Sequence, residues 1–160
     1  MVTWATSPRF SLTLYRLTEK EFMHKILYHL PEIDLVADKL LTMIRHPYVL
    51  FEAPMGAGKT TLIGKLIEKL SPQAFLGSPT FSLVNEYLTH EGEPLYHFDL
   101  YRLKSPEELL DIGFEEYLDQ ARYVFIEWPE RAREFMPVPH TLIRIEPAGD
   151  TSRILQISNS

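Results

Sequence analysis

The amino-acid sequence predicts an α/β fold: a three-layer domain with a mostly parallel central sheet and antiparallel strands at its C-terminal edge. The short runs "YVLF" and "YVFIE" are apolar on both faces, which is typical of buried parallel strands. Segments with the three-to-four spacing of amphipathic helices lie between the strand-like segments. Near the end of the chain, "TLIRIE" and "RILQIS" flank "PAGDT" as the two strands of a hairpin would. Strands joined by helices and followed by antiparallel pieces indicate one α/β sheet domain.

Length and composition are those of an ordinary globular domain. A chain of 160 residues buries roughly 70% of the surface that its unfolded state exposes, which is enough for one core. The net charge of −6 opposes unaided binding to nucleic acid, so we expect no DNA binding and contact with RNA only through a partner. No apolar run approaches the roughly 20 residues that cross a bilayer, and no secretory signal is recognisable, so we expect a cytoplasmic protein without membrane contact. The absence of cysteine excludes disulfides and thiolate metal sites.

The N-terminal half contains an extension and then a helix, a strand and a second helix. Residues 1–22 show no sustained period, so we expect an extension of uncertain structure there, with Met23 as a second possible start and residues 23–160 as a single domain. Over residues 30–44, apolar side chains recur at helical spacing, and "HP" ends this helix before the strand "YVLF". After a glycine-rich turn, the apolar spacing of residues 63–70 marks the second helix, which "SPQ" ends.

The C-terminal half continues the alternation of strands and helices. "TFSLVNEYL" and "LYHFDLY" have the β-branched and aromatic content of strands. "SPEELLDIGF" begins with a capping box, Ser105 with Glu108, and has Pro106 at the first helical position, so we expect a helix to start there. "YVFIE" then repeats the buried-strand pattern, and the hairpin segments follow it.

The segment "APMGAGKT", residues 53–60, matches the relaxed form of the phosphate-binding pattern G-x-x-x-x-G-K-[ST]. Small residues let several backbone N–H groups point at one anion, and the following helix adds its positive N-terminal end. Ala53 stands where the strict pattern has its first glycine, so the entry turn must be available to a residue with a side chain. Such a loop between a buried strand and a helix indicates a P-loop NTPase-like domain, in which Lys59 contacts the β- and γ-phosphates of ATP and the Thr60 hydroxyl binds Mg²⁺. The candidate nucleotide-binding residues of the loop are Met55, Gly56, Ala57, Gly58, Lys59, Thr60 and Thr61.

Two acidic residues follow strand-like segments, Glu127 after "YVFI" and Asp99 in "HFDLYR". An acid at the carboxyl end of a parallel strand points into the crevice where such sheets bind ligands. Glu127 is a candidate Mg²⁺ ligand, and Asp99 is a candidate to position the attacking water or to hold the metal through water. The residues alone leave open which acid positions the water, and they also allow a solvated Glu127 or an Asp99 that pairs with Arg102. His97 is expected to pack rather than to react.

The motifs "GAGKTT", "SPTFSLVNEY", "HFDLYRL" and "IEWPER", in this order and separation, resemble those of the TsaE family, formerly called the YjeE family. The resemblance covers roughly residues 30–158. It implies a small bacterial ATPase that binds ATP and Mg²⁺ and works with the TsaB and TsaD proteins in N6-threonylcarbamoylation of adenosine 37 of tRNAs reading codons that begin with A. It also implies that hydrolysis is slow without these partners and that tRNA is met only through the complex.

The same resemblance assigns roles to individual residues. Ala-Pro-Met at residues 53–55 replaces the usual Gly-Asp-Leu of the family, and the segment before Met23 has no family counterpart. By the matching motifs, Thr60 and Glu127 resemble the Mg²⁺ ligands, Asp99 an acid required for hydrolysis, Thr80 a switch-like residue near the γ-phosphate, and Glu130 a nucleotide contact. Asp99, Lys59 and Thr80 are therefore the candidate catalytic residues.

Two other functions are compatible with the same loop. A small-molecule kinase would require an acceptor pocket and an arginine-bearing lid, and the dense basic candidate "ERARE" also fits a solvated helix face. A non-catalytic nucleotide-binding scaffold would not need the complete set of Lys59, Thr60, Asp99 and Glu127. Release of phosphate from ATP with Mg²⁺, with and without candidate partners, distinguishes these functions from an ATPase.

Overall fold

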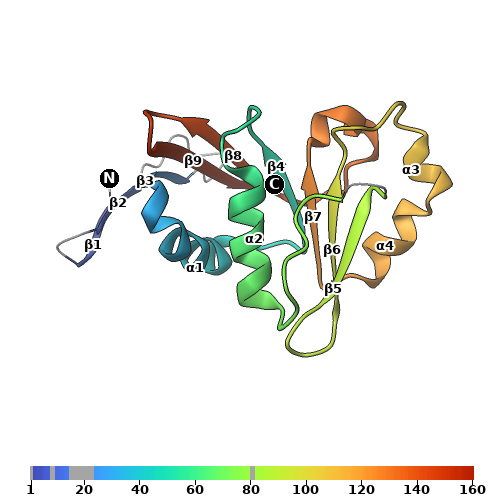
Figure 1. The fold of residues 1–160 in the computed structure, drawn as a ribbon, viewed down its shortest axis with the longest axis horizontal. Helices are drawn as coiled ribbons and strands as arrows, with labels where there is room; N and C mark the ends of the chain where they lie inside the picture. The colour runs from blue at the N-terminus through green and yellow to red at the C-terminus, as the bar shows by residue number, and fades with distance from the viewer. Residues whose placement is uncertain (1, 8–9, 15–23, 80–81) are drawn as a thin grey trace.

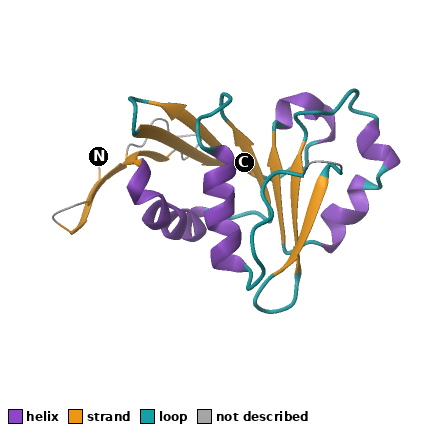
Figure 2. Ribbon diagram, viewed as in Figure 1, coloured by secondary structure: helices purple, strands orange, loops and turns teal. Residues whose placement is uncertain are grey.

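A computed structural model describes residues 2–7, 10–14, 24–79 and 82–160. A seven-stranded sheet lies between two layers of helices, which confirms the expected three-layer α/β class (Figures 1 and 2). The strand order is β3-β9-β8-β4-β7-β6-β5. Its strands are β3 His24–His29, β4 Tyr48–Glu52, β5 Val84–Leu88, β6 Pro94–Asp99, β7 Tyr123–Glu127, β8 Thr141–Pro147 and β9 Ser152–Asn159.

Helices cover both faces of the sheet, and a separate pair of strands precedes it. The pair, β1 Val2–Ser7 and β2 Phe10–Leu14, forms its own antiparallel two-stranded sheet. None of the helices in the described ranges is long and apolar enough to cross a membrane. The helical segments are η1 Leu30–Glu32, α1 Ile33–Met43, α2 Lys59–Leu70, α3 Glu108–Asp111, α4 Phe114–Gln120 and η2 Pro129–Phe135.

The centre of the sheet is parallel and its edges are antiparallel. Strand β4 pairs in parallel with β7 and β8, and β6 pairs in parallel with β7. At the C-terminal edge β8 and β9 form the expected hairpin. Two further antiparallel pairs, β3 with β9 and β5 with β6, complete the sheet. Because β4, β6 and β7 run in the same direction, their carboxyl ends meet at the same edge of the sheet.

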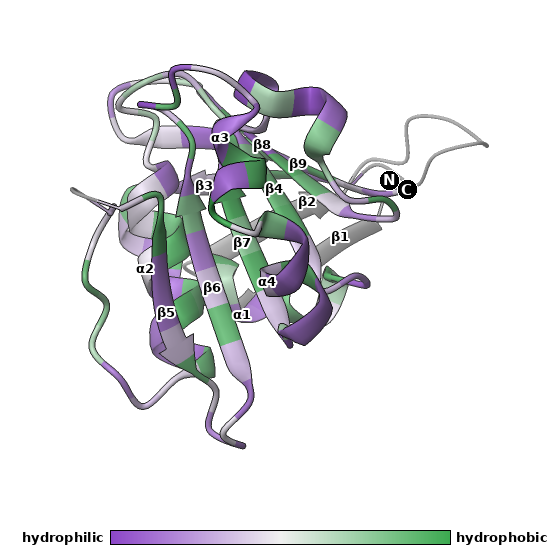
Figure 3. Ribbon diagram, turned by 90° about the vertical axis from the view of Figure 1, so that its right-hand side faces the viewer, coloured by the Kyte–Doolittle hydropathy of each residue, from purple (hydrophilic) through white to green (hydrophobic). Residues whose placement is uncertain are grey.

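The alternation of side chains along the central strands divides the core into two layers. Val49, Phe51 and Phe125 pack with the buried side chains of α1 and α2. Leu50 and Ile126 point to the opposite face and pack with those of α3 and α4. Each fully buried side chain of this kind contributes roughly 1.5–3 kcal/mol by leaving water. Figure 3 shows the hydrophobic residues of β4 and β7 lying behind the largely hydrophilic α4.

Two elements differ from the expectations. Strand β3 was not predicted, and it pairs with β9 through residues Ile26 and Tyr28, which are fully buried. The helix expected to start at Ser105 begins at Glu108 instead. The Glu108 carboxylate does accept the Ser105 N–H at 3.1 Å, but residues 106–107 form a turn rather than helix. Gly113 then takes a φ of 72°, which separates the short α3 from α4.

Strand β3 offers a matched test of core packing. We expect Ile26→Ala to lower the free energy of unfolding by about 3 kcal/mol, because it removes a fully buried side chain and leaves a cavity. The adjacent residue of the same strand, Leu27, is 48% exposed. Leu27→Ala is therefore expected to change the free energy of unfolding by less than about 1 kcal/mol. Urea unfolding of the two variants measures the difference. Equal losses of stability would contradict the placement of β3 in the core.

Candidate functional site

The loop between β4 and α2 has the backbone of a phosphate-binding turn. Gly56 and Gly58 take φ angles of 78° and 100°, a region that residues with a Cβ rarely adopt. Gly58 is also the N-cap of α2. Ala53 does not take a positive φ, so the alanine that replaces the first glycine of the pattern is compatible with the turn. The N-terminal end of α2, with its free N–H groups, therefore faces the loop.

Lys59, the first residue of α2, is the cation of this loop. Its side chain is 6% exposed, and its Nζ donates a hydrogen bond to the Ala53 carbonyl at 3.0 Å. The ammonium group also lies 3.3 Å from the centre of the Trp128 ring. Burial lowers the pKa of Lys59, and the carboxylates of Glu127, Glu130 and Asp99 oppose that shift. Lys59 is therefore held within the site by contacts at both of its sides.

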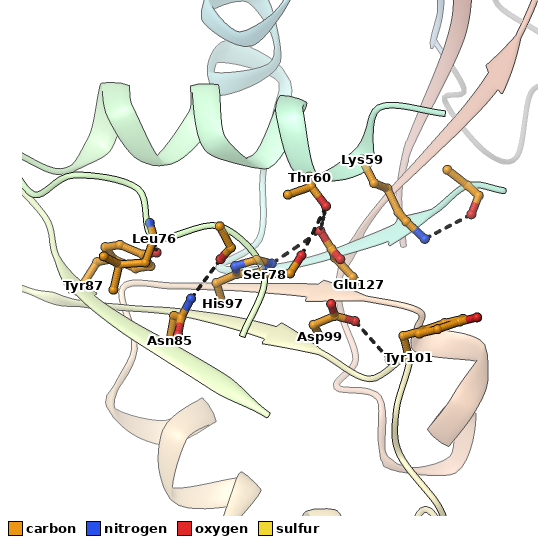
Figure 4. A network of polar contacts seen from close by, with 12 residues as sticks. Lys59, Thr60, Leu76, Ser78, Asn85, Tyr87, His97, Asp99, Tyr101 and Glu127 are labelled. Carbon is orange, nitrogen blue, oxygen red and sulfur yellow. Dashed lines mark hydrogen bonds and ion pairs between the residues drawn. The ribbon is translucent and has the colours of Figure 1, made fainter. Parts of the chain in front are cut away.

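The Thr60 hydroxyl connects the loop to the neighbouring strand. It donates a hydrogen bond to Glu127 Oε1 at 3.2 Å and lies 3.3 Å from the Ser78 hydroxyl. Glu127 is the last residue of β7 and is only 2% exposed. In the parallel pairing of β4 with β7, Glu127 stands beside Phe51. The oxygens of Thr60, Ser78 and Glu127 thus converge at the first turn of α2, as Figure 4 shows.

Asp99 ends the next strand, β6, and stands beside Glu127 in the β6–β7 register. Its Oδ1 accepts the Tyr101 N–H at 3.0 Å. Burial raises the pKa of Asp99, and the charge of Glu127 raises it further. Hydrogen bonds from Tyr101 and Ser78 and the proximity of His97 act in the opposite direction. Two carboxylates are thus held close together in a partly buried site, which is the situation in which an acid resists ionisation.

The chain turns sharply directly after Glu127. Trp128 takes a φ of 59° and a ψ of 48°, a left-handed conformation that costs roughly 1–2 kcal/mol in a residue with a bulky side chain. Its ring lies 4.9 Å from the Tyr101 ring, between centroids. The turn directs the indole toward Lys59 on one side and Tyr101 on the other. The strained backbone of Trp128 therefore places its aromatic ring beside the phosphate loop.

His97 lies beneath the acidic pair and is fully buried. Its Nε2 is 3.5 Å from Glu127 Oε1, a long contact, and neither ring nitrogen has a hydrogen-bond partner among the described residues. The ring packs at 6.0 Å against Phe75. Packing accords with the expectation for His97, and its contact with Glu127 adds a neighbour that the sequence did not indicate.

The segment 75–78 carries Ser78, a site residue that the sequence analysis missed. Tyr87 accepts the Leu76 N–H at 3.0 Å, and the Asn85 side chain donates to the Gly77 carbonyl at 2.9 Å. Both anchors come from β5 and hold the segment alongside α2, as Figure 4 shows. Ser78 belongs to the same "SPTF" motif as Thr80, the residue selected from the sequence, so that motif was the available signal. Thr80 itself lies outside the described residues.

A cavity of about 310 Å³ opens between the loop and the acids. Ala57 is buried behind it, 1% exposed. Glu130 instead lines a neighbouring groove of about 500 Å³, which shares Pro54 and Trp128 with the cavity. The predicted residues that line the cavity together are Met55, Gly56, Gly58, Lys59, Thr60, Thr61, Asp99 and Glu127.

The donor set fits a hard cation such as Mg²⁺. No group of three or more His, Cys, Asp or Glu side chains able to hold a metal by themselves occurs among the residues that the structure describes. Thr60 and Glu127 nevertheless bring a hydroxyl and a carboxylate oxygen together. Mg²⁺ prefers oxygen ligands and is usually held by one or two protein groups together with phosphate oxygens and water. The residues present therefore fit a metal that binds together with a nucleotide.

The chain is similar to several proteins of known name. The family described as "Threonylcarbamoyl adenosine biosynthesis protein TsaE" matches residues 31–155. The tRNA threonylcarbamoyladenosine biosynthesis protein TsaE of Haemophilus influenzae is 37% identical over 112 residues, which are 70% of this chain and 70% of that protein. The protein of the same name from Nostoc sp. is 43% identical over 109 residues, 65% of this chain and 64% of that protein. A crystal structure of YdiB from Bacillus subtilis has a TM-score of 0.69 at 25% identity, covering 89% of this chain and 88% of that chain.

The acidic pair predicts a gain of stability on removal of one charge. Without nucleotide and Mg²⁺, we expect Asp99→Asn to raise the free energy of unfolding at neutral pH, because an amide keeps the acceptor for Tyr101 without the buried charge. A carboxyl whose folded pKa exceeds its unfolded pKa contributes stability below the unfolded pKa and loses it as pH rises through the folded pKa. The advantage of the variant should therefore shrink as the solution is acidified.

Urea titrations over an acidic-to-neutral pH series measure this effect. Asp38→Asn is the matched control, because Asp38 is exposed and its Oδ1 lies 2.8 Å from Lys69 Nζ in a surface ion pair. The control is expected to lower stability slightly at neutral pH. An Asp99→Asn variant that is less stable than the wild type at neutral pH would show that the carboxylate of Asp99 is not held at a cost.

Proposed function

Because the chain belongs to the TsaE family, we propose that it is an Mg²⁺-dependent ATPase that supports the TsaB and TsaD proteins in forming N6-threonylcarbamoyladenosine at position 37 of tRNA. The observation that carries the proposal is the hydrogen bond between Thr60 of the phosphate loop and Glu127 at the end of the adjacent strand. This contact joins a nucleotide-binding loop to a buried carboxylate with Asp99 beside it. A binding scaffold would not need the acids, whereas phosphoryl transfer to water uses both kinds of group.

The proposal has a place for each part of ATP. The phosphates bind in the cavity, where Gly58 and the following residues of α2 present N–H groups and Lys59 presents its charge. The nucleoside lies in the neighbouring groove, whose lining includes Glu130 and the shared residue Trp128. In this arrangement Glu130 contacts the nucleoside rather than the phosphates. Mg²⁺ bound by Thr60 and Glu127 would neutralise charge on the β- and γ-phosphate oxygens.

We assign hydrolysis to the acidic edge of the cavity. Asp99 is partly buried, its pKa is raised, and its Oδ1 is oriented by the Tyr101 N–H. A carboxylate with a raised pKa is suited to accept a hydrogen bond from an attacking water and to orient it. Glu127 is more deeply buried and accepts a hydrogen bond from Thr60. We therefore assign Glu127 to the metal ion and Asp99 to the attacking water.

The proposed role in a complex follows from the charge of the chain and from the family. A net charge of −6 opposes direct binding of tRNA, so tRNA is bound by the partners and the ATPase acts in the cytoplasm on the complex. ATP hydrolysis then serves repeated rounds of modification by favouring one state of the complex until the γ-phosphate is released. Thr80 is the proposed switch residue that detects this phosphate.

Phosphate release tests this function directly. We expect slow hydrolysis of ATP with Mg²⁺ by the chain alone and faster hydrolysis when TsaB and TsaD are added. Glu127→Ala should lower the partner-stimulated rate by about 100-fold or more while ATP still binds, because its contribution is greatest in the transition state. Equal rates with and without the partners, together with full tRNA modification over many turnovers when this chain is omitted, would refute the role.

Two of the lysines of α2, Lys59 and Lys65, provide a test of the phosphate site. Lys59→Ala is expected to weaken ATP binding by roughly 100-fold or more, because it removes a charged donor that faces the phosphates. Lys65→Ala removes the same charge from the same helix, where Lys65 pairs with Glu68 at 3.1 Å on the surface, and should leave the affinity within about threefold of the wild type. Calorimetry with folded variants measures both affinities. Unchanged affinity of Lys59→Ala would overturn the assignment of the loop.

A further inference from the structure

Arg153 of β9 reaches the phosphate loop from behind. In the sheet it stands beside Tyr28 of β3 and Pro147 of β8. Its side chain is 9% exposed, which is low for an arginine. Arg153 is 96 residues away from Ala57 in the sequence, yet its Nε donates a hydrogen bond to the Ala57 carbonyl at 2.9 Å. The terminal hairpin and the loop are therefore joined by a buried contact.

A second nitrogen of Arg153, Nη1, also holds its guanidinium in place. Nη1 donates to the Ser152 carbonyl at 2.8 Å and to the Gly149 carbonyl at 3.2 Å. Gly149 lies in the turn between β8 and β9, and Ser152 is the first residue of β9, so the planar group is fixed by the hairpin as well as by the phosphate loop. Three hydrogen bonds from Nε and Nη1 leave this side chain little conformational freedom, so Arg153 is a rigid support.

The contact determines the direction of one peptide group in the loop. In a trans peptide the C=O and the following N–H point to opposite sides. Since Arg153 holds the Ala57 carbonyl at the buried side, the N–H of Gly58 points away from Arg153. Gly58 lines the cavity and has a φ of 100°. At the other end of the loop, Lys59 holds the Ala53 carbonyl, so side-chain donors hold a carbonyl at each end.

The charge of Arg153 is also uncompensated within the described part of the chain. No carboxylate there lies within ion-pair distance of its guanidinium, and its three hydrogen bonds to described residues all go to backbone carbonyls. A buried cation without an anionic partner is costly, and an anion bound nearby reduces that cost. The neighbouring loop, which presents N–H groups to the cavity, is the element at which such an anion would bind.

We propose that Arg153 is a positioning residue of the phosphate site: it sets the Ala57–Gly58 peptide so that its N–H faces the ligand, and it adds a fixed positive charge behind the loop. The inference rests on the proposed function only in that the ligand is a nucleotide phosphate. Because Arg153 does not line the cavity, it acts through the loop and not by touching the ligand.

Three variants of the full chain test this role. Arg153→Met removes the charge and the donors while keeping an extended side chain, and Arg153→Lys keeps the charge and one donor group. Ser152→Ala is the matched control, because the Ser152 hydroxyl lies 3.0 Å from His29 Nδ1 and ties the same hairpin to β3 without touching the loop. ATP affinity with Mg²⁺ is measured by calorimetry, and the amide hydrogen exchange of residues 53–60 is measured in the ligand-free protein.

Arg153→Met is expected to bind ATP roughly 10- to 100-fold more weakly, the loss that corresponds to one charge-assisted hydrogen bond, and to exchange its loop amides faster. Arg153→Lys should recover part of both properties, and Ser152→Ala should match the wild type in both. Wild-type affinity and loop exchange in Arg153→Met would show that Arg153 supports only the hairpin. If Arg153→Met does not fold, Arg153→Lys decides by the same criterion, with reduced affinity supporting the role and wild-type values for both measurements overturning it.

The two measurements separate this inference from the proposed function. A wild-type chain that binds no ATP would refute the proposed ATPase. The exchange comparison would then still decide whether Arg153 orders the loop, because it is made without ligand.

Discussion

The parallel pairing of β4 with β7 is the constraint on which the whole site depends. It places the phosphate loop, which follows β4, next to Glu127 at the end of β7. The pairing of β7 with β6 adds Asp99 on the far side of Glu127. Parallel strands have their carboxyl ends at the same edge of the sheet. The phosphate loop after β4, Glu127 at the end of β7 and Asp99 at the end of β6 therefore lie close together, although they are distant in the sequence. The Thr60 hydroxyl then closes the remaining gap by its bond to Glu127.

The charged groups at this edge of the sheet lower the stability of the protein and are arranged to bind a charged ligand. Burial lowers the pKa of Lys59 and raises that of Asp99, so both groups are less favourably charged than they would be in water. In the proposed complex with Mg²⁺ and ATP, phosphate oxygens would place negative charge beside Lys59, and the divalent cation would place positive charge beside Asp99 and Glu127. A site that is strained without its ligand is common where binding and catalysis need groups held in advance.

The groups that contact the ligand in this proposal are held by residues outside the cavity. Ser78 reaches Thr60 because Asn85 and Tyr87 tie the 75–78 segment to β5. Arg153 holds the buried side of the loop from β9. These supports come from strands on opposite sides of β4 and β7, so the rigidity of the site depends on both halves of the sheet. This dependence gives the antiparallel strands a role beyond completing the core.

Local pattern in the sequence determined the fold class, the phosphate loop and the two acids. The spacing of the glycines and Lys59 indicates a phosphate-binding loop from a few neighbouring residues alone. An acid after an apolar run likewise indicates the end of a buried strand, wherever that strand lies in the sheet. Strand β3 was not predicted, because six residues at a sheet edge carry too little periodicity to separate them from the preceding segment. The start of α3 was predicted too early, because the "SPEE" pattern did not distinguish a turn at residues 106–107 from the first turn of a helix.

Only the tertiary structure decided how these pieces support one another. The contacts of Arg153 with Ala57 and of Ser78 with Thr60 join residues whose separation in the sequence carries no periodic signal. The placement of Glu130 in the groove beside the cavity depends on the left-handed turn at Trp128, which nothing in a tryptophan predicts. Sequence patterns record which residues an element contains, whereas the packing of elements determines which of their side chains meet.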